Sequence, residues 1–173
     1  MAMLYIGLVA MVGCSFDPPS LTADDGLGAT PEPAPPPPCA SDPQFIVRDG
    51  SPNRYFFSAT SLLWFAAANF CESNGAYLVT VEDEAEDTYV FEQANVGLLW
   101  IGLNDVQSEG NFVWHGGQIT DYRNFDPAEP NGGTNENCGE IRQDRQGRWN
   151  DAQCNGDPRR FVCECEPTSP GTE

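Results

Sequence analysis

The chain contains no lysine and a single histidine, so its eight basic residues are all arginines. It has 26 aspartates and glutamates, which give a formal net charge of -18 at pH 7. Nucleic acids and anionic membrane surfaces attract proteins through clusters of positive charge. We therefore expect neither as a direct partner. The acidic balance is typical of an exposed surface or of a protein that binds cations.

Sequence motifs of catalytic sites are also missing. The chain has no Gly-x-Ser-x-Gly and no His-Glu-x-x-His motif, the patterns typical of serine hydrolases and zinc peptidases. Its only histidine, His115, has no second histidine to share a catalytic site and is expected at the surface. We predict that the chain is not an enzyme.

The chain begins with a short apolar run at residues 1–13. It is too short to cross a bilayer as a helix, which takes about 20 residues, and is typical of a signal peptide. Met11-Val12-Gly13-Cys14 resembles a bacterial lipobox, which implies a lipid on Cys14, and Ser15 implies the outer membrane. Met11 stands where Leu is usual, and no basic residue precedes the run. The alternative is an ordinary secretory signal followed by a chance cysteine.

Composition divides the remaining chain into a spacer, one domain and a tail. Residues 14–44 hold most of the prolines, with four in a row at 35–38. Such a segment cannot bury enough apolar area to fold and should form a semi-rigid spacer. We expect one domain at residues 45–166, which suits the chain length, and a flexible tail at 167–173.

Hydrophobic spacing within the domain predicts two helices and several strands. Apolar residues at helical spacing predict a helix over residues 63–74, ended by Gly75, and a second helix follows Thr80. Apolar runs predict strands at residues 55–57, 76–79, 98–103 and 160–163. Residues 104–139 lack a regular period and predict a long loop, which is often functional. We expect the acidic residues 82–87 to be solvated and the four tryptophans to lie in the core.

Oxygen-bearing side chains gather between residues 129 and 151. They are the carboxylates of Glu129, Glu136 and Asp151 and the amides of Asn131 and Asn150. Ca²⁺ takes roughly 6–8 oxygen ligands of these kinds, whereas zinc prefers Cys sulfur and His nitrogen. The segment therefore predicts a calcium site.

Several short motifs follow one another in a characteristic order. They are Trp64 seven residues before Cys71, Trp100-Ile101-Gly102-Leu103, Phe112-Val113-Trp114, Glu129-Pro130-Asn131, Trp149-Asn150-Asp151 and Phe161-Val162-Cys163-Glu164. In this order and spacing, the chain resembles the C-type lectin-like domain over residues 45–166. The resemblance implies an α+β fold of two helices and small antiparallel sheets, with a long calcium-binding loop and stapling disulfides.

Seven cysteines indicate an oxidising compartment, and the odd number leaves one without a partner in the chain. The family resemblance implies two bridges, and the family's neighbouring termini lead us to expect a third between the two remaining domain cysteines. The three pairs are Cys71–Cys163, Cys138–Cys154 and Cys39–Cys165. Cys14 is left over, as lipidation would require.

The same resemblance implies a set of ligands for the family's principal calcium ion. The five residues are Glu129, Asn131, Glu136, Asn150 and Asp151. All but Asp151 would also contact two neighbouring hydroxyls of a sugar, with carboxylates accepting and amides donating. In this family, Glu-Pro-Asn is associated with a cis peptide before the proline and with the equatorial hydroxyls of mannose, N-acetylglucosamine, glucose or fucose.

A second, auxiliary calcium position is implied by Asp105, Glu109 and Asn137, with Glu136 shared. Two residues depart from the family's pattern. Gly132 stands where Asp is usual, and Asn137 replaces an acid and so removes a charge.

Together these observations lead us to expect a calcium-dependent carbohydrate-binding module of mannose type on a bacterial cell surface, with Cys14 as its only membrane anchor. The alternative is a calcium-stabilised module of the same fold that binds protein instead of sugar. Glu129 and Glu136 could also form a glycosidase pair. As calcium ligands, however, both would stay ionised and leave no proton donor.

Overall fold

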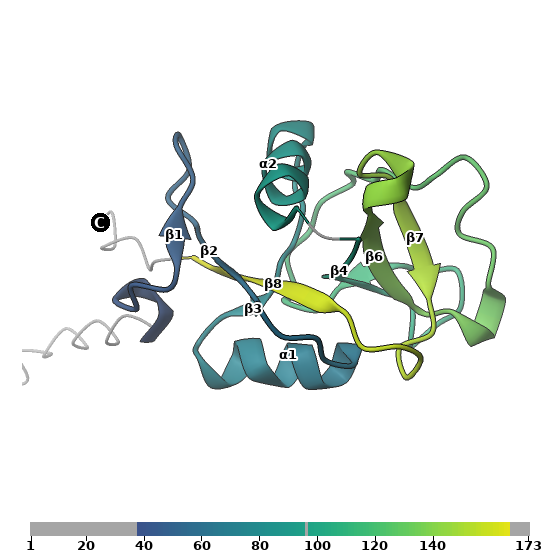
Figure 1. The fold of residues 1–173 in the computed structure, drawn as a ribbon. Helices are drawn as coiled ribbons and strands as arrows, with labels where there is room; N and C mark the ends of the chain where they lie inside the picture. The colour runs from purple at the N-terminus through teal and green to yellow at the C-terminus, as the bar shows by residue number, and fades with distance from the viewer. Residues whose placement is uncertain (1–37, 96, 167–173) are drawn as a thin grey trace, which may run out of the picture. The chain divides into compact units, whose positions relative to one another are not determined.

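The computed structural model describes residues 38–95 and 97–166 (Figure 1). The predicted signal peptide, Cys14, most of the spacer and the tail lie outside the described residues. The described part begins with the short helix Pro38–Ala40. Residues 38–44, which we assigned to the spacer, therefore include the fully buried Cys39. Within the described ranges, no helix combines the length and the apolar character that a membrane crossing needs.

The described residues form two α-helices and eight strands. The helices are α1 (Trp64–Ser73) and α2 (Glu84–Ala94). The strands are β1 (Ile46–Val47), β2 (Arg54–Phe57), β3 (Tyr77–Leu78), β4 (Leu98–Asn104), β5 (Val113–Trp114), β6 (Cys138–Arg142), β7 (Trp149–Ala152) and β8 (Arg160–Cys165). This confirms the expected α+β class and both predicted helices. The predicted long loop contains β5 and a short 3-10 helix, Gly133–Asn135.

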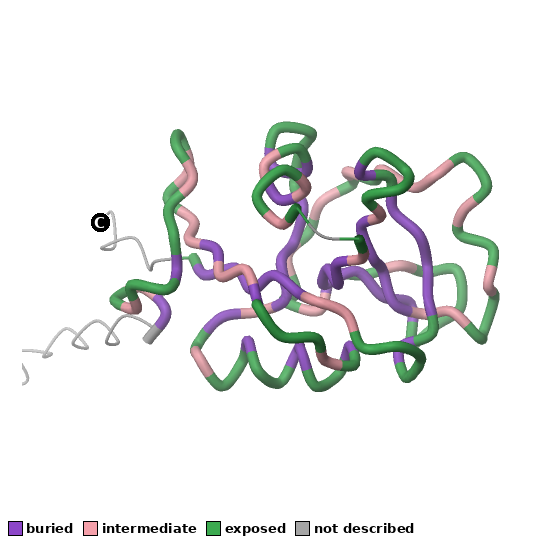
Figure 2. Tube along the Cα trace, viewed as in Figure 1, coloured by how far each residue is buried: buried purple, intermediate pink, exposed green. Residues whose placement is uncertain are grey.

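The strands form one twisted arrangement around β8, in the order β1-β2-β8-β4-β6-β7. All the pairings are antiparallel except that of β4 with β8. The two helices lie on opposite sides of β8, and the β6–β7 hairpin lies beside the long loop (Figure 1). Strands β4, β7 and β8 are buried along nearly all of their length (Figure 2).

Aromatic side chains fill the core, and all four tryptophans are buried, as predicted. At the start of α1, the indole N–H of Trp64 donates to the Ile101 carbonyl on β4 at 2.8 Å. A second cluster surrounds Trp149, whose ring meets three other aromatic rings nearly edge-on. Such contacts add stability beyond the area that they bury. The Trp149 cluster supports the strand that carries Asn150 and Asp151.

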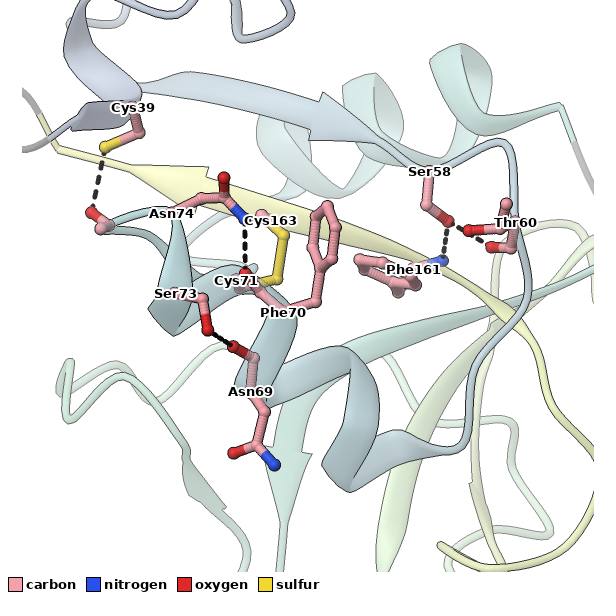
Figure 3. The surroundings of a disulfide bond; sticks show 11 residues. Cys39, Ser58, Thr60, Asn69, Phe70, Cys71, Ser73, Asn74, Phe161 and Cys163 are labelled. Carbon is pink, nitrogen blue, oxygen red and sulfur yellow. Dashed lines mark hydrogen bonds between the residues drawn. A yellow bond between two sulfur atoms is a disulfide. The ribbon is translucent and has the colours of Figure 1, made fainter.

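Three disulfides hold the domain together. Two have the pairings that the family resemblance implies, and the third is the one expected from the neighbouring termini of the domain. They are Cys39–Cys165, Cys71–Cys163 and Cys138–Cys154. The Cys71–Cys163 bridge ties α1 to β8 beside the packed rings of Phe70 and Phe161 (Figure 3). Just after α1, Gly75 adopts a left-handed φ of +70°, which is typical of a helix C-terminus.

The acidic segment at residues 82–87 differs from our expectation. Glu86 and Asp87 are buried, with only 1% and 4% of their surfaces exposed. The cause is the start of α2, where the Asp83 carboxylate caps the helix by accepting from the Glu86 N–H. Glu86 and Asp87 therefore lie on the buried face of the helix, together with Val90. His115, which we expected at the surface, is half-buried and lies edge-on against the Trp64 ring.

Glu86 faces a second buried carboxylate, Glu164 on β8. Glu164 accepts hydrogen bonds from the Asn53 amide at 2.7 Å and from the Thr80 N–H at 3.0 Å, while Glu86 accepts from the Tyr55 hydroxyl. Burial, together with the negative charge of Glu86, raises the pKa of Glu164 from 4.5 to about 8. At neutral pH the folded protein therefore retains a proton that the unfolded chain releases.

Replacing this carboxyl group should change how stability depends on pH. Since the folded state binds the extra proton between about pH 4.5 and 8, the free energy of unfolding should fall as pH rises through this window, by up to about 1.4 kcal/mol per pH unit. We expect Glu164→Gln to flatten this slope in denaturant titrations from pH 5 to 8. The exposed Glu92→Gln provides the control. Equal slopes in Glu164→Gln and the wild-type chain would contradict the assignment.

Candidate functional site

The predicted calcium ligands come from two separate parts of the chain. Asn150 and Asp151 lie on β7, next to the Cys138–Cys154 bridge. Glu129 and Asn131 lie in the long loop, and Glu136 precedes β6. The loop runs alongside the start of β7, because the Trp149 N–H donates to the Asn124 carbonyl at 2.8 Å and the Asp126 N–H donates to the Trp149 carbonyl at 2.9 Å.

The buried Asp87 on α2 anchors this arrangement. Its carboxylate accepts from the Trp149 indole at 2.9 Å, from the Tyr122 hydroxyl at 3.1 Å and from the Asn124 amide. One side chain thus holds both the long loop and β7. Asp87 was not among the predicted site residues. Asp87 lies three residues before the buried Val90 on α2, and this helical spacing could have indicated that Asp87 is buried. The surrounding acidic residues obscured that signal.

Asp151 closes the Glu129–Asn131 turn onto β7. Its two carboxylate oxygens accept from the backbone N–H groups of Asn131 at 3.1 Å and Gly132 at 2.9 Å. The peptide between Glu129 and Pro130 is cis, as the family resemblance implies. Each oxygen of Asp151 keeps a second lone pair, so these hydrogen bonds leave room for a cation.

Glu129 carries the clearest signal for a cation site. Its Oε2 atom is buried and has no hydrogen-bond partner among the described residues. Burial, followed by the nearby carboxylates of Asp151, Glu136 and Asp126, raises the pKa of Glu129. An unpartnered buried oxygen among like charges is unfavourable, and a divalent cation would offset both costs.

Glu136 lies against Gly132. A Cβ added at Gly132 would lie 2.2 Å from the Glu136 Cβ and 2.3 Å from its Oε2. Real Cβ atoms essentially never approach other atoms so closely, so the Glu136 side chain occupies the space that a larger residue 132 would need. The glycine at this position, a departure from the family's pattern, therefore sets where the Glu136 carboxylate lies.

The two amides use their N–H groups inside the protein. Nδ2 of Asn150 donates to Glu140 at 3.0 Å and to the Asp151 carbonyl, and Nδ2 of Asn131 donates to the Ala128 carbonyl at 3.2 Å. This orientation leaves Oδ1 of both amides available as a cation ligand. It uses both N–H groups of Asn150, so in this arrangement only Asn131 retains an amide N–H for a ligand.

The auxiliary residues lie close to the principal set. Asp105 is buried, with Oδ2 accepting from the Gly110 N–H at 2.8 Å and Oδ1 lacking a partner among the described residues. Its backbone N–H donates to the Asn137 carbonyl at 3.1 Å. Loss of solvent, followed by the carboxylates of Asp105 and Asp151, raises the pKa of the exposed Glu109.

In the described ranges, no three His, Cys, Asp or Glu side chains converge closely enough to hold a metal by themselves. Two of the five principal donors are asparagines, and Asp151 is turned toward backbone N–H groups. The donors are nonetheless all oxygens, and Glu129 and Asp105 each have a buried oxygen without a described partner. This chemistry fits Ca²⁺.

Glu136 and Asn150 also line a hollow of about 350 Å³. Residues of β6 and β7 form one part of its wall, and the segment that precedes β8 forms another. Its floor contains the ion pair of Glu140 and Arg159, and the Arg159 guanidinium lies 4.2 Å from the centre of the Trp100 ring. Burial raises the pKa of Glu140, and Arg159 opposes this effect. The candidate cation site therefore borders an open hollow.

Comparison with known proteins agrees with this fold. Residues 60–165 match the family model described as the lectin C-type domain. Lectin BRA-3 from Megabalanus rosa is 34% identical over 113 residues, which cover 64% of this chain and 69% of BRA-3. The low affinity immunoglobulin epsilon Fc receptor of Mus musculus is 36% identical over 121 residues, covering 67% of this chain but only 36% of the receptor.

A solved structure adds a comparison in three dimensions. The cow C-type carbohydrate-recognition domain of CD23, crystallised in the presence of a GlcNAc2Man3 oligosaccharide, is 32% identical. It aligns with a TM-score of 0.67 over 74% of this chain and 97% of that domain. Since the family model covers more than half of the chain, and the fold and disulfides agree with it, this chain belongs to the C-type lectin domain family.

Proposed function

We propose that the domain binds carbohydrate through a calcium ion held by Glu129, Asn131, Glu136, Asn150 and Asp151. The observation that carries this proposal is the buried Oε2 of Glu129, which has no hydrogen-bond partner in the described part of the chain and lies in a turn that Asp151 ties to β7. Three carboxylates and two amide oxygens partly fill the coordination shell of Ca²⁺. Asp105, Glu109 and Asn137 would hold an auxiliary ion in the same way.

Sugar binding follows from an incomplete shell. Bound there, the ion would offer its remaining positions to two neighbouring hydroxyls of a sugar. The Glu129 and Glu136 carboxylates accept from these hydroxyls, and the free amide N–H of Asn131 donates to one of them. For Asn150 to donate as well, its amide must exchange an internal hydrogen bond for one to the sugar.

The order Glu-Pro-Asn supports a mannose-type preference, for mannose, N-acetylglucosamine or fucose. The cow relative was crystallised with an oligosaccharide that contains N-acetylglucosamine and mannose, which is consistent with this class. The relatives compared here are named as lectins or receptors, and none is named as an enzyme. We therefore propose a binding module and no catalysis.

We further propose that the module is displayed on a bacterial surface by a lipid on Cys14, with residues 15–37 as spacer. The relatives named above come from animals, so this part rests on the sequence of residues 1–14 alone. One small site should bind a sugar weakly, and many copies anchored in one membrane would raise the effective concentration.

Calorimetry and retention on a mannan resin test the site directly. The oxidised full-length chain should release or absorb heat when Ca²⁺ is added, and should bind mannan in Ca²⁺ but not in a chelator. Free mannose should elute it, and galactose should not. Absence of a calcium heat would contradict the proposal. Retention that survives the chelator would instead favour calcium-independent binding to another surface.

A matched double substitution serves as the control for sugar preference. Glu129→Gln with Asn131→Asp keeps the size of both side chains and exchanges the acid and the amide. We expect it to retain a calcium heat and to shift elution from mannose toward galactose. An unchanged preference would mean that this turn does not select the sugar.

Gly132→Ala should weaken calcium binding. The added Cβ would displace the Glu136 side chain, so we expect the calcium Kd to rise about tenfold, equivalent to about 1.4 kcal/mol. Gly97→Ala is the control, because an added Cβ there meets no atom within 4 Å. An unchanged Kd in Gly132→Ala would show that the carboxylate of Glu136 is not a ligand.

Lipidation can be followed in a bacterial host. Radioactive palmitate should label the wild-type chain, and Cys14→Ser should abolish the label and release the protein from membranes. The other six cysteines form disulfides and should not be labelled. Labelling that persists in Cys14→Ser would place the lipid elsewhere or point to another anchor.

A further inference from the structure

A larger hollow, of about 540 Å³, lies next to the candidate sugar site. The first turn of α1 contributes Phe65, and the start of the long loop contributes Val106. The segment that leads into β6 contributes Asn135 and Asn137, and the segment after β7 contributes Gln153 and Asn155. Its volume lies in the range of roughly 300–1,000 Å³ that is usual for small-ligand sites.

Both apolar and polar side chains line the hollow. Phe65 and Val106 are 42% and 46% exposed, so two apolar side chains face solvent on its wall. Glu109 and Asn137 also line the hollow and are proposed ligands of the auxiliary ion. The amide side chains of Asn135, Gln153 and Asn155 make no side-chain hydrogen bond to any other described residue. They can therefore offer both donors and acceptors to a ligand without breaking a bond inside the protein.

The two hollows meet at Gln153. This residue lines the larger hollow and also the smaller one, to which Glu136 and Asn150 belong. Asn135 and Asn137 lie on either side of Glu136 in the chain. Because the two hollows share Gln153, a ligand held at Glu136 and Asn150 lies beside the larger hollow.

We propose that the larger hollow is a second sugar subsite, which takes the monosaccharide residue joined to the one held at the calcium site. This inference rests on the proposed function. A pyranose ring has one face of C–H groups, which suits the exposed Phe65 ring and Val106, and a rim of hydroxyls, which suits amides that can both donate and accept. The natural ligand would then be an oligosaccharide of at least two linked residues.

Phe65 is well suited to such a contact and can be tested without disturbing the core. Its ring lies edge-on to the buried Trp64, with 5.2 Å between ring centres, which holds it in place. Phe70, further along α1, is exposed to a similar extent, but it packs against Phe56 and Phe161. Phe70 therefore supports the fold, whereas the exposed part of Phe65 faces the hollow.

The experiment compares a monosaccharide with disaccharides on the full-length chain. Kd values are measured in Ca²⁺ for methyl α-mannoside and for the α1-2, α1-3 and α1-6 mannobioses. We expect at least one disaccharide to bind about fivefold more tightly than the monosaccharide, the scale of one aromatic contact. Phe65→Ala and Asn155→Ala should remove that advantage and leave the monosaccharide Kd unchanged.

Val113→Ala is the matched control, since Val113 is 42% exposed and lies outside the hollow. It should keep the disaccharide advantage. If methyl α-mannoside binds but no disaccharide binds more tightly, or if the advantage survives Phe65→Ala, the subsite is overturned and the calcium site stands. If neither sugar binds, the proposed function itself fails, and the subsite fails with it.

Discussion

The position of the long loop between β5 and β6 depends on one buried carboxylate. Between β5 and β6 the chain has little regular structure, so its backbone cannot fix its own course by ladder hydrogen bonds. Asp87 supplies that order from α2, through the Trp149 indole and two side chains of the loop. The loop and β7 are thereby held together one residue before Asn150. The side chains of this irregular loop can therefore keep fixed positions, because a residue of α2, outside the candidate site, holds the loop against β7.

Uncompensated negative charge recurs through the structure. Glu129, Glu136 and Asp151 gather at the loop, while Glu86 and Glu164 meet in the core. The core pair can respond by keeping a proton and by accepting hydrogen bonds. The loop has fewer such means, because Oε2 of Glu129 has no partner among the described residues. The same physical problem thus has an internal solution in the core, and under the proposed function a bound cation would solve it at the loop.

The sequence predicted the parts of the structure that depend on local pattern or on family motifs. Helix α1 followed from its spacing and Gly75, and the cis peptide before Pro130 followed from the Glu-Pro-Asn motif. Contacts that depend on packing in three dimensions could not be predicted. The burial of Asp87, the contact of Glu136 with Gly132 and the hollow beside Phe65 each join residues that are far apart in sequence or that pack by shape. In a chain this acidic, composition alone predicts that a residue such as Asp87 is solvated.

Different side chains build the buried frame and the surface around the hollows. Two of the disulfides tie β8 to α1 and to the start of the described chain, and the rings around Trp64 and Trp100 fill the space between. The third disulfide, Cys138–Cys154, lies at the end of β7, and Cys154 itself lines the larger hollow. Side chains such as Phe65 and Gln153 project from this fixed base into solvent. Under the proposed function, changes to them would alter what the surface contacts while leaving the buried core intact.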